Sequence, residues 1–179
     1  MNLPNKITIF RVCMIPIFVF FMLVSGIPGG RYIASAIFII AALSDLLDGY
    51  IARKHNLVTN FGKFMDPLAD KLLVSSALIC LVDLKLLPAW IVIIIIAREF
   101  IISGFRLIAS DNGVVIAASW WGKIKTTVQM VMSIMLIINL DHPFINLLEQ
   151  VAIYLAAFLT VISLIDYMLK NKNVLKEKH

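Results

Sequence analysis

Six apolar segments, each about 20 residues long, account for most of this chain. They lie near residues 7–23, 32–52, 64–82, 87–108, 120–140 and 147–169. A helix of about 20 apolar residues is long enough to cross the hydrocarbon core of a bilayer. Only 15% of the 179 residues are charged, where soluble domains have about a quarter, so lipid is the solvent that suits this surface. The pattern predicts an all-α integral membrane protein, a six-helix transmembrane bundle forming a single domain over residues 1–179.

Lys and Arg residues are distributed unevenly between the two ends of the predicted spans. With six spans both termini share one side, and 14 of the 16 Lys and Arg residues fall on that side. Arg31 and Lys85 fall on the other. Because cytoplasmic loops are enriched in Lys and Arg, we expect a cell-membrane protein with both termini in the cytoplasm. The same distribution explains the net charge of +5 through contact with membrane lipids, so we expect no nucleic-acid partner.

Four aspartates interrupt the second and third apolar segments. Asp45 and Asp48 are three residues apart, and Asp66 and Asp70 are four apart, so each pair lies on one helix face. Antiparallel helices would bring the two acidic faces together near the cytoplasmic end. A carboxylate at the bilayer centre costs about 2.5–3.5 kcal/mol, so four together need a compensating partner. Carboxylate oxygens suit hard ions such as Mg²⁺, Mn²⁺ or Ca²⁺, which predicts a divalent-metal site.

Small residues and one arginine accompany these aspartates. Gly49, Ala52 and Gly62 lie on the same helix faces and leave room beside the metal ions. Arg53 offers a planar fork of donors that matches a phosphate group. Metal ions neutralise charge and polarise phosphorus, so the combination predicts a pyrophosphate-binding site.

Together these residues form the string Asp45-x2-Asp48-Gly49-x2-Ala52-Arg53-x8-Gly62-x3-Asp66-x3-Asp70. The string resembles the signature of the CDP-alcohol phosphotransferase family at every fixed position. The resemblance implies that family's six-helix membrane fold, a homodimer, and two divalent metal ions, Mg²⁺ or Mn²⁺. It implies that Asp45, Asp48 and Asp66 bind metal, and that Asp70 completes the second metal site and is the catalytic base. The residues implied to contact the CDP-lipid are Gly49, Ala52, Arg53 and Gly62.

Shorter motifs narrow this resemblance to one branch of the family. Residues 3–8 (Leu-Pro-Asn-Lys-Ile-Thr) with Arg11, residues 97–100 (Ala-Arg-Glu-Phe) and residues 122–126 (Gly-Lys-Ile-Lys-Thr) are similar to certain bacterial members. Those members transfer the phosphatidyl group of CDP-diacylglycerol to glycerol 3-phosphate, giving phosphatidylglycerophosphate and CMP. The resemblance therefore implies CDP-diacylglycerol and glycerol 3-phosphate as substrates, and it implies that Asn5 and Thr8 help to hold the nucleotide head.

Cationic residues in the later segments fit an anionic acceptor. Arg98 and Arg106 are eight residues apart, and we expect them to share a helix face. Lys123 and Lys125 stand at the cytoplasmic start of the fifth segment. An arginine within a span is costly unless it pairs or binds an anion. We expect these four residues to bind the phosphate of glycerol 3-phosphate, with neutralisation of Arg98 by Glu99 as the open alternative.

Two other functions stay open at this stage. The same chemistry with another acceptor would define a cardiolipin, phosphatidylserine or inositol-lipid synthase. A metal-ion or proton-coupled transporter also uses carboxylates within the membrane, but it predicts them along a continuous path at several depths. The four aspartates lie instead at one end of two segments, and we expect no acid in the outer half of any span.

Overall fold

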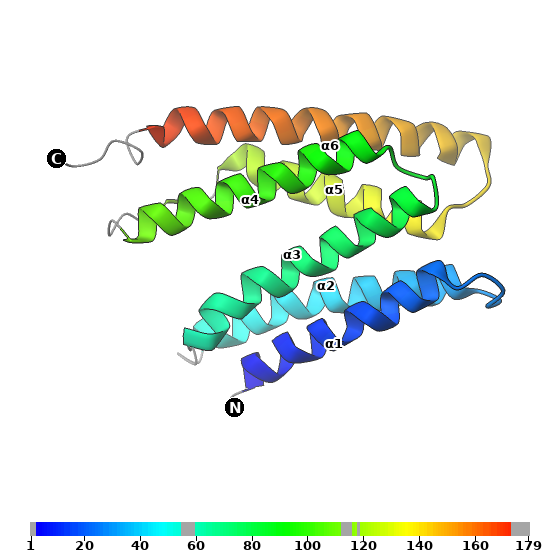
Figure 1. Cartoon of the computed structure of the whole chain (residues 1–179), viewed down its shortest axis with the longest axis horizontal. Coiled ribbons are helices and arrows are strands. Elements are labelled where there is room, and N and C mark those ends of the chain that lie inside the picture. Colours follow the sequence, from blue (N-terminus) through cyan, green and yellow to red (C-terminus); the bar gives the residue numbers. More distant parts are fainter. Residues whose placement is uncertain (1–2, 55–59, 112–115, 118, 173–179) are drawn as a thin grey trace. The chain divides into compact units, whose positions relative to one another are not determined.

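A computed structural model describes residues 3–54, 60–111, 116–117 and 119–172. The side chains of residues 3–4, 46–54, 60–61 and 63–64 lie outside this description. Within the described residues the secondary structure is entirely helical, which confirms the predicted all-α, six-helix fold. The helices are α1 (Leu3–Leu23), α2 (Gly30–Lys54), α3 (Asn60–Asp83), α4 (Ala89–Asp111), α5 (Trp120–Ile138) and α6 (Pro143–Lys170) (Figure 1). Each helix overlaps one predicted apolar segment.

The chain divides into two compact units. The first comprises Met1–Leu86 with Leu136–Asn139, and it contains α1, α2 and α3. The second comprises Leu87–Met135 with Leu140–His179, and it contains α4, α6 and most of α5. The single-domain expectation from the sequence stays a prediction.

Helix α1 organises the first unit, because it packs against both α2 and α3 (Figure 1). Its buried positions recur every three or four residues and so form one helix face. They are Asn5, Thr8, Arg11, Ile15, Phe18 and Met22. The ring of Phe18 packs on that of Phe38 in α2, with centroids 5.8 Å apart. The buried face is therefore polar in its first half and apolar in its second.

The connection between α1 and α2 depends on glycine. Gly26 and Gly29 have φ angles of 100° and 72°, in the left-handed region that residues with a Cβ rarely adopt. The carbonyl of Gly29 accepts hydrogen bonds from the N–H groups of Tyr32 and Ile33 in the first turn of α2. The connection between the first two predicted segments is thus a tight turn.

In the second unit, α4 packs against α6. Phe105 and Tyr167 meet edge to face with ring centroids 6.3 Å apart, and Ile102 joins them in the core. Helix α6 starts at Pro143, four residues before the predicted segment, because His142 caps it: the His142 Nδ1 accepts from the Phe144 N–H at 3.3 Å. This capping role of His142 was not predicted.

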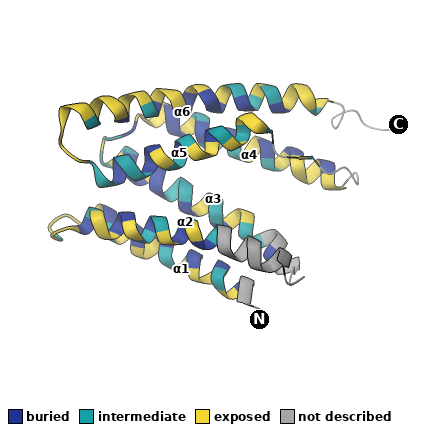
Figure 2. Cartoon of the chain, turned by 180° about the vertical axis from the view of Figure 1, so that it is seen from behind, coloured by how far each residue is buried: buried dark blue, intermediate teal, exposed yellow. Residues whose placement is uncertain are grey.

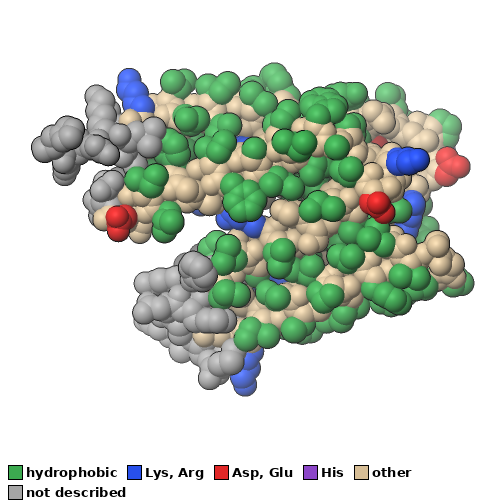
Figure 3. All heavy atoms as spheres, in the orientation of Figure 1, with side chains coloured by type: hydrophobic (Ala, Val, Ile, Leu, Met, Phe, Trp, Pro, Cys, Tyr) green, Lys and Arg blue, Asp and Glu red, His purple; other side chains and the backbone are tan. Residues whose placement is uncertain are grey.

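The surface pattern of both units is the reverse of that of a soluble protein. Leu107 and Ile93 are 74% and 66% exposed, whereas Arg11 is fully buried and Lys125 is 1% exposed. Exposed positions run along the helices, and hydrophobic side chains are spread over the visible face of each unit (Figures 2 and 3). Two stretches in the described helices meet the length and hydropathy requirements of a membrane span, Asn5–Leu23 and Pro143–Lys170. The six-span topology stays a prediction.

Candidate active site

Helix α1 contacts the first motif aspartate through Arg11. The Arg11 Nη1 donates to Asp45 Oδ1 at 2.7 Å, and its Nε donates to Ser44 Oγ at 3.5 Å. Arg11 is fully buried, whereas the Asp45 side chain is 35% exposed. A buried guanidinium requires a counter-ion, and Asp45 provides it.

Asp66, the third aspartate of the motif, is bonded by Thr8, which lies on the same face of α1 one turn before Arg11. The Thr8 Oγ1 donates to Asp66 Oδ1 at 2.5 Å, and Thr8 is fully buried. The assignment of Thr8 and the buried Asn5 to the nucleotide head stays a prediction, and Arg11 has no predicted role beyond its place in a short motif. The three-residue spacing of Asn5, Thr8 and Arg11 was the signal that could have identified a polar face turned toward the acidic helices.

The remaining motif residues are only partly described. Helix α2 includes the positions of Asp48, Gly49, Ala52 and Arg53, but their side chains lie outside the described residues, so their roles stay predictions. On α3, Gly62 is buried, and Asp70 is partly buried one turn after Asp66. Among the described side chains, no three His, Cys, Asp or Glu residues form a group that could hold a metal ion. The four-aspartate site therefore stays a prediction too.

The described carboxylates nevertheless suit a hard divalent cation. Asp45 and Asp66 come from neighbouring helices of one unit, and the contacts from α1 engage Oδ1 of each. A carboxylate has two oxygens, so bonding at Oδ1 is compatible with a metal ion at Oδ2. Oxygen ligands favour Mg²⁺ or Mn²⁺ over softer metals.

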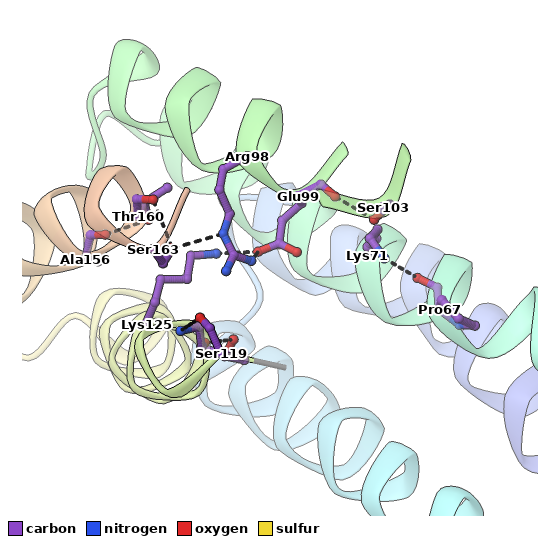
Figure 4. A network of polar contacts seen from close by, with 12 residues as sticks. Pro67, Lys71, Arg98, Glu99, Ser103, Ser119, Lys125, Ala156, Thr160 and Ser163 are labelled. Carbon is purple, nitrogen blue, oxygen red and sulfur yellow. Dashed lines mark hydrogen bonds and ion pairs between the residues drawn. The ribbon is translucent and has the colours of Figure 1, made fainter. Parts of the chain in front are cut away.

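The second unit contains a buried cationic network around Glu99. The Glu99 Oε1 accepts from Arg98 Nη1 at 3.0 Å and from Lys125 Nζ at 2.5 Å. The Arg98 Nε donates to Ser163 Oγ of α6 at 3.1 Å, so three helices meet here (Figure 4). Arg98 and Lys125 are both more than nine-tenths buried. Glu99 therefore pairs with two of the cations that the sequence assigned to the acceptor phosphate, and the open alternative for Arg98 is observed.

The other two predicted acceptor residues lie in a different environment. Arg106 and Lys123 are exposed, in contrast to Arg98. The expectation that Arg98 and Arg106 share one helix face is therefore wrong, because eight residues at about 100° each leave them about 80° apart. Gly122 precedes Lys123, and a Cβ at Gly122 would lie 3.1 Å from the Arg98 Nη2. A residue without a side chain is thus what allows the guanidinium to approach α5 this closely.

One acidic residue within a predicted span, Glu149, was not identified from the sequence. Glu149, near the start of α6, is 7% exposed, and within the described part of the chain its Oε1 has no hydrogen-bond partner. It lies in the half of the predicted sixth span that the expected topology places outside, so the expectation of no acid there is wrong. A lone carboxylate at that end does not make a continuous acidic path. Asp166, also in α6, pairs with Lys170 at 2.7 Å.

A helical chain with an apolar outer surface and an oxygen-rich acidic motif on adjacent helices has the features of a membrane phosphotransferase. Residues 1–162 match the CDP-alcohol phosphatidyltransferase family, and the chain belongs to this family. Its members are integral membrane enzymes that use divalent metal ions.

The sequences of individual relatives match almost the whole chain. A CDP-diacylglycerol–glycerol-3-phosphate 3-phosphatidyltransferase of Bacillus subtilis is 48% identical, covering 98% of this chain and 97% of its own. The enzyme of the same description from Haemophilus influenzae is 41% identical over 93% of this chain and 91% of its own. A probable phosphatidylglycerophosphate synthase of Mycobacterium tuberculosis is 40% identical, covering 93% of this chain and 80% of its own.

Proposed function

We propose that this chain transfers the phosphatidyl group of CDP-diacylglycerol to glycerol 3-phosphate, giving phosphatidylglycerophosphate and CMP. The observation that carries the proposal is the complete eight-residue motif, which α2 and α3 present within one unit. Relatives described by this reaction match nearly all of the chain, including the motif segment.

The reaction is a direct displacement at the lipid-proximal phosphorus. The 1-hydroxyl oxygen of glycerol 3-phosphate forms a bond to that phosphorus, and the bond from phosphorus to the CMP oxygen breaks. Asp70 accepts the hydroxyl proton, and CMP leaves with the electron pair. General-base assistance of this kind is worth about 10²–10⁴-fold.

Two divalent ions, Mg²⁺ or Mn²⁺, would be held by Asp45, Asp48, Asp66 and Asp70. When bound, they neutralise the diphosphate and polarise the phosphorus. In this proposal the small residues Gly49, Ala52 and Gly62 leave space for the CDP-lipid, and Arg53, Asn5 and Thr8 help to bind it.

The acceptor is bound through its phosphate by cationic residues of the second unit. Arg106 and Lys123 are exposed and supply direct contacts in this proposal. Arg98 and Lys125 are already paired with Glu99. In this proposal they attract the acceptor phosphate through the net positive charge of two cations and one carboxylate. We also propose a homodimer with both termini and the active site at the cytoplasmic side of the cell membrane.

Release of CMP from CDP-diacylglycerol tests this function. Purified protein in detergent micelles with Mn²⁺ is offered glycerol 3-phosphate, serine, inositol or phosphatidylglycerol as acceptor. We expect release with glycerol 3-phosphate far above release with the others, and none in excess EDTA. Preference for another acceptor would assign a different lipid synthase, and turnover in EDTA would remove the metal requirement. Light scattering of the purified protein checks the dimer.

A further inference from the structure

Two motif aspartates on different helices are both bonded by α1, from residues one helical turn apart. Arg11 donates to Asp45 of α2, and Thr8 donates to Asp66 of α3. Because α1 packs against both of these helices, its polar face links the two carboxylates. The eight-residue aspartate motif does not include either donor.

The burial of the donors gives these contacts a defined geometry. Thr8 and Arg11 are both fully buried, so neither side chain is free to sample solvent-facing rotamers. The guanidinium has a second anchor, since its Nε donates to Ser44 Oγ, and Ser44 Oγ in turn donates to the Ala41 carbonyl at 2.7 Å. Arg11 is thereby held by two adjacent residues of α2, through its Nε by Ser44 and through its Nη1 by Asp45.

Each donor binds Oδ1 of its aspartate, which fixes the rotation of the carboxylate. Partners of this kind orient the groups that coordinate a metal ion, and their loss typically weakens metal binding by roughly 10- to 100-fold. A purely structural contact would instead change folding stability and leave metal affinity unaltered. The two interpretations therefore differ in a measurable quantity.

We propose that Thr8 and Arg11 are positioning residues of the metal site, which hold the carboxylates of Asp66 and Asp45 in orientations that receive divalent ions. The inference rests on the proposed function, because it takes these aspartates as metal ligands. It adds to that function a role for α1 as the element that sets metal affinity before any substrate binds.

The test is Mn²⁺ binding to the substrate-free protein in detergent, with free Mn²⁺ measured by electron paramagnetic resonance. Thr8→Val keeps the shape of the side chain but removes the hydroxyl, and we expect it to weaken Mn²⁺ binding roughly 10- to 100-fold. Thr8→Ser keeps the hydroxyl and is the matched control, with an affinity close to that of the original chain. Equal affinity in the Val and Ser variants would overturn the role of Thr8.

Arg11→Lys is the corresponding change at the second donor. It retains a positive charge beside Asp45, so the carboxylate keeps a counter-ion, but it lacks the fork that also contacts Ser44. We expect weaker Mn²⁺ binding with the protein still folded by circular dichroism. Unchanged or tighter binding would mean that Arg11 does not position Asp45.

The unaltered chain separates failure of this inference from failure of the proposed function. If it binds no Mn²⁺ and needs none for CMP release, the proposal of a metal site is wrong. If it binds Mn²⁺ while Thr8→Val and Arg11→Lys bind equally well, the proposed function stands and the positioning role is rejected.

Discussion

Asp70 has a proposed role that the other motif aspartates lack, since it accepts the proton of the attacking hydroxyl. An amide at this position has no basic oxygen of comparable strength, so Asp70→Asn should lower the rate of CMP release by about 10²–10⁴-fold. Binding of CDP-diacylglycerol should persist better than in Asp45→Asn, which removes a ligand paired with buried Arg11. Initial rates and lipid binding of both variants decide this. Near-normal rates for Asp70→Asn across the pH range would rule out the base assignment.

Arg106 and Lys123 give the clearest test of the acceptor site, because both side chains are exposed and their loss should not disturb the fold. Charge-assisted hydrogen bonds contribute about 1.5–3 kcal/mol, so Arg106→Gln or Lys123→Gln should raise the KM for glycerol 3-phosphate roughly tenfold or more. The KM for CDP-diacylglycerol should hardly change. Kinetics with each substrate varied separately measure both values, and equal losses toward both substrates would contradict an acceptor-specific role.

At the level of residues, the sequence predicted the helices on which the motif aspartates lie, but it did not predict the hydrogen-bond partners of these side chains. The spacing of the aspartates placed them on α2 and α3, but it could not show that α1 bonds to Asp45 and Asp66. Such contacts depend on how helices pack, which local periodicity does not specify. Likewise, Glu99 was recognised as a neighbour of Arg98, but its bond to Lys125 joins residues 26 positions apart.

At the level of elements, length and hydropathy were sufficient to predict six helices, because a continuous apolar run of about 20 residues has few other folded states in lipid. Helix ends were less accurate, since they depend on caps such as His142. The buried face of α1 was missed, because Asn5, Thr8 and Arg11 are polar and a soluble helix would expose them. In a membrane helix the polar face turns toward the protein interior, which is the reverse of its position in a soluble protein.

The close approach of the Arg98 side chain of α4 to Gly122 of α5 makes a prediction at the level of elements. A Cβ at Gly122 would lie 3.1 Å from the Arg98 Nη2, and Arg98 is held in place by Ser163 and Glu99. We expect Gly122→Ala to displace the guanidinium and to lower the thermal unfolding midpoint in detergent.

Gly104 provides the matched control within the same unit. A Cβ there would meet nothing within 4 Å, and alanine favours a helix over glycine by about 0.5–1 kcal/mol. Gly104→Ala should therefore leave the midpoint unchanged or raise it. Similar midpoints for Gly104→Ala and Gly122→Ala would show that the Arg98 network tolerates the extra methyl group.

At the scale of the whole molecule, the distribution of charge predicts the orientation of the chain in the membrane. Of the 16 Lys and Arg residues, 14 fall on the side of the predicted spans that carries both termini. The exposed leucine and isoleucine side chains on both units match a lipid environment, as the sequence composition predicted. The sequence could not reveal the division into two units, because that depends on contacts between helices rather than on the helices themselves.

Orientation is testable with single cysteines in a background of Cys13→Ser and Cys80→Ser. Lys85→Cys, in the turn after α3, should react with a membrane-impermeant maleimide on intact cells, because the expected topology places it outside. Lys172→Cys, just beyond α6, should react only after the membrane is permeabilised. Both native side chains are exposed in their units, so differences in labelling report the side of the membrane rather than burial. Labelling of Lys172→Cys in intact cells would reverse the predicted orientation and place the C-terminus outside.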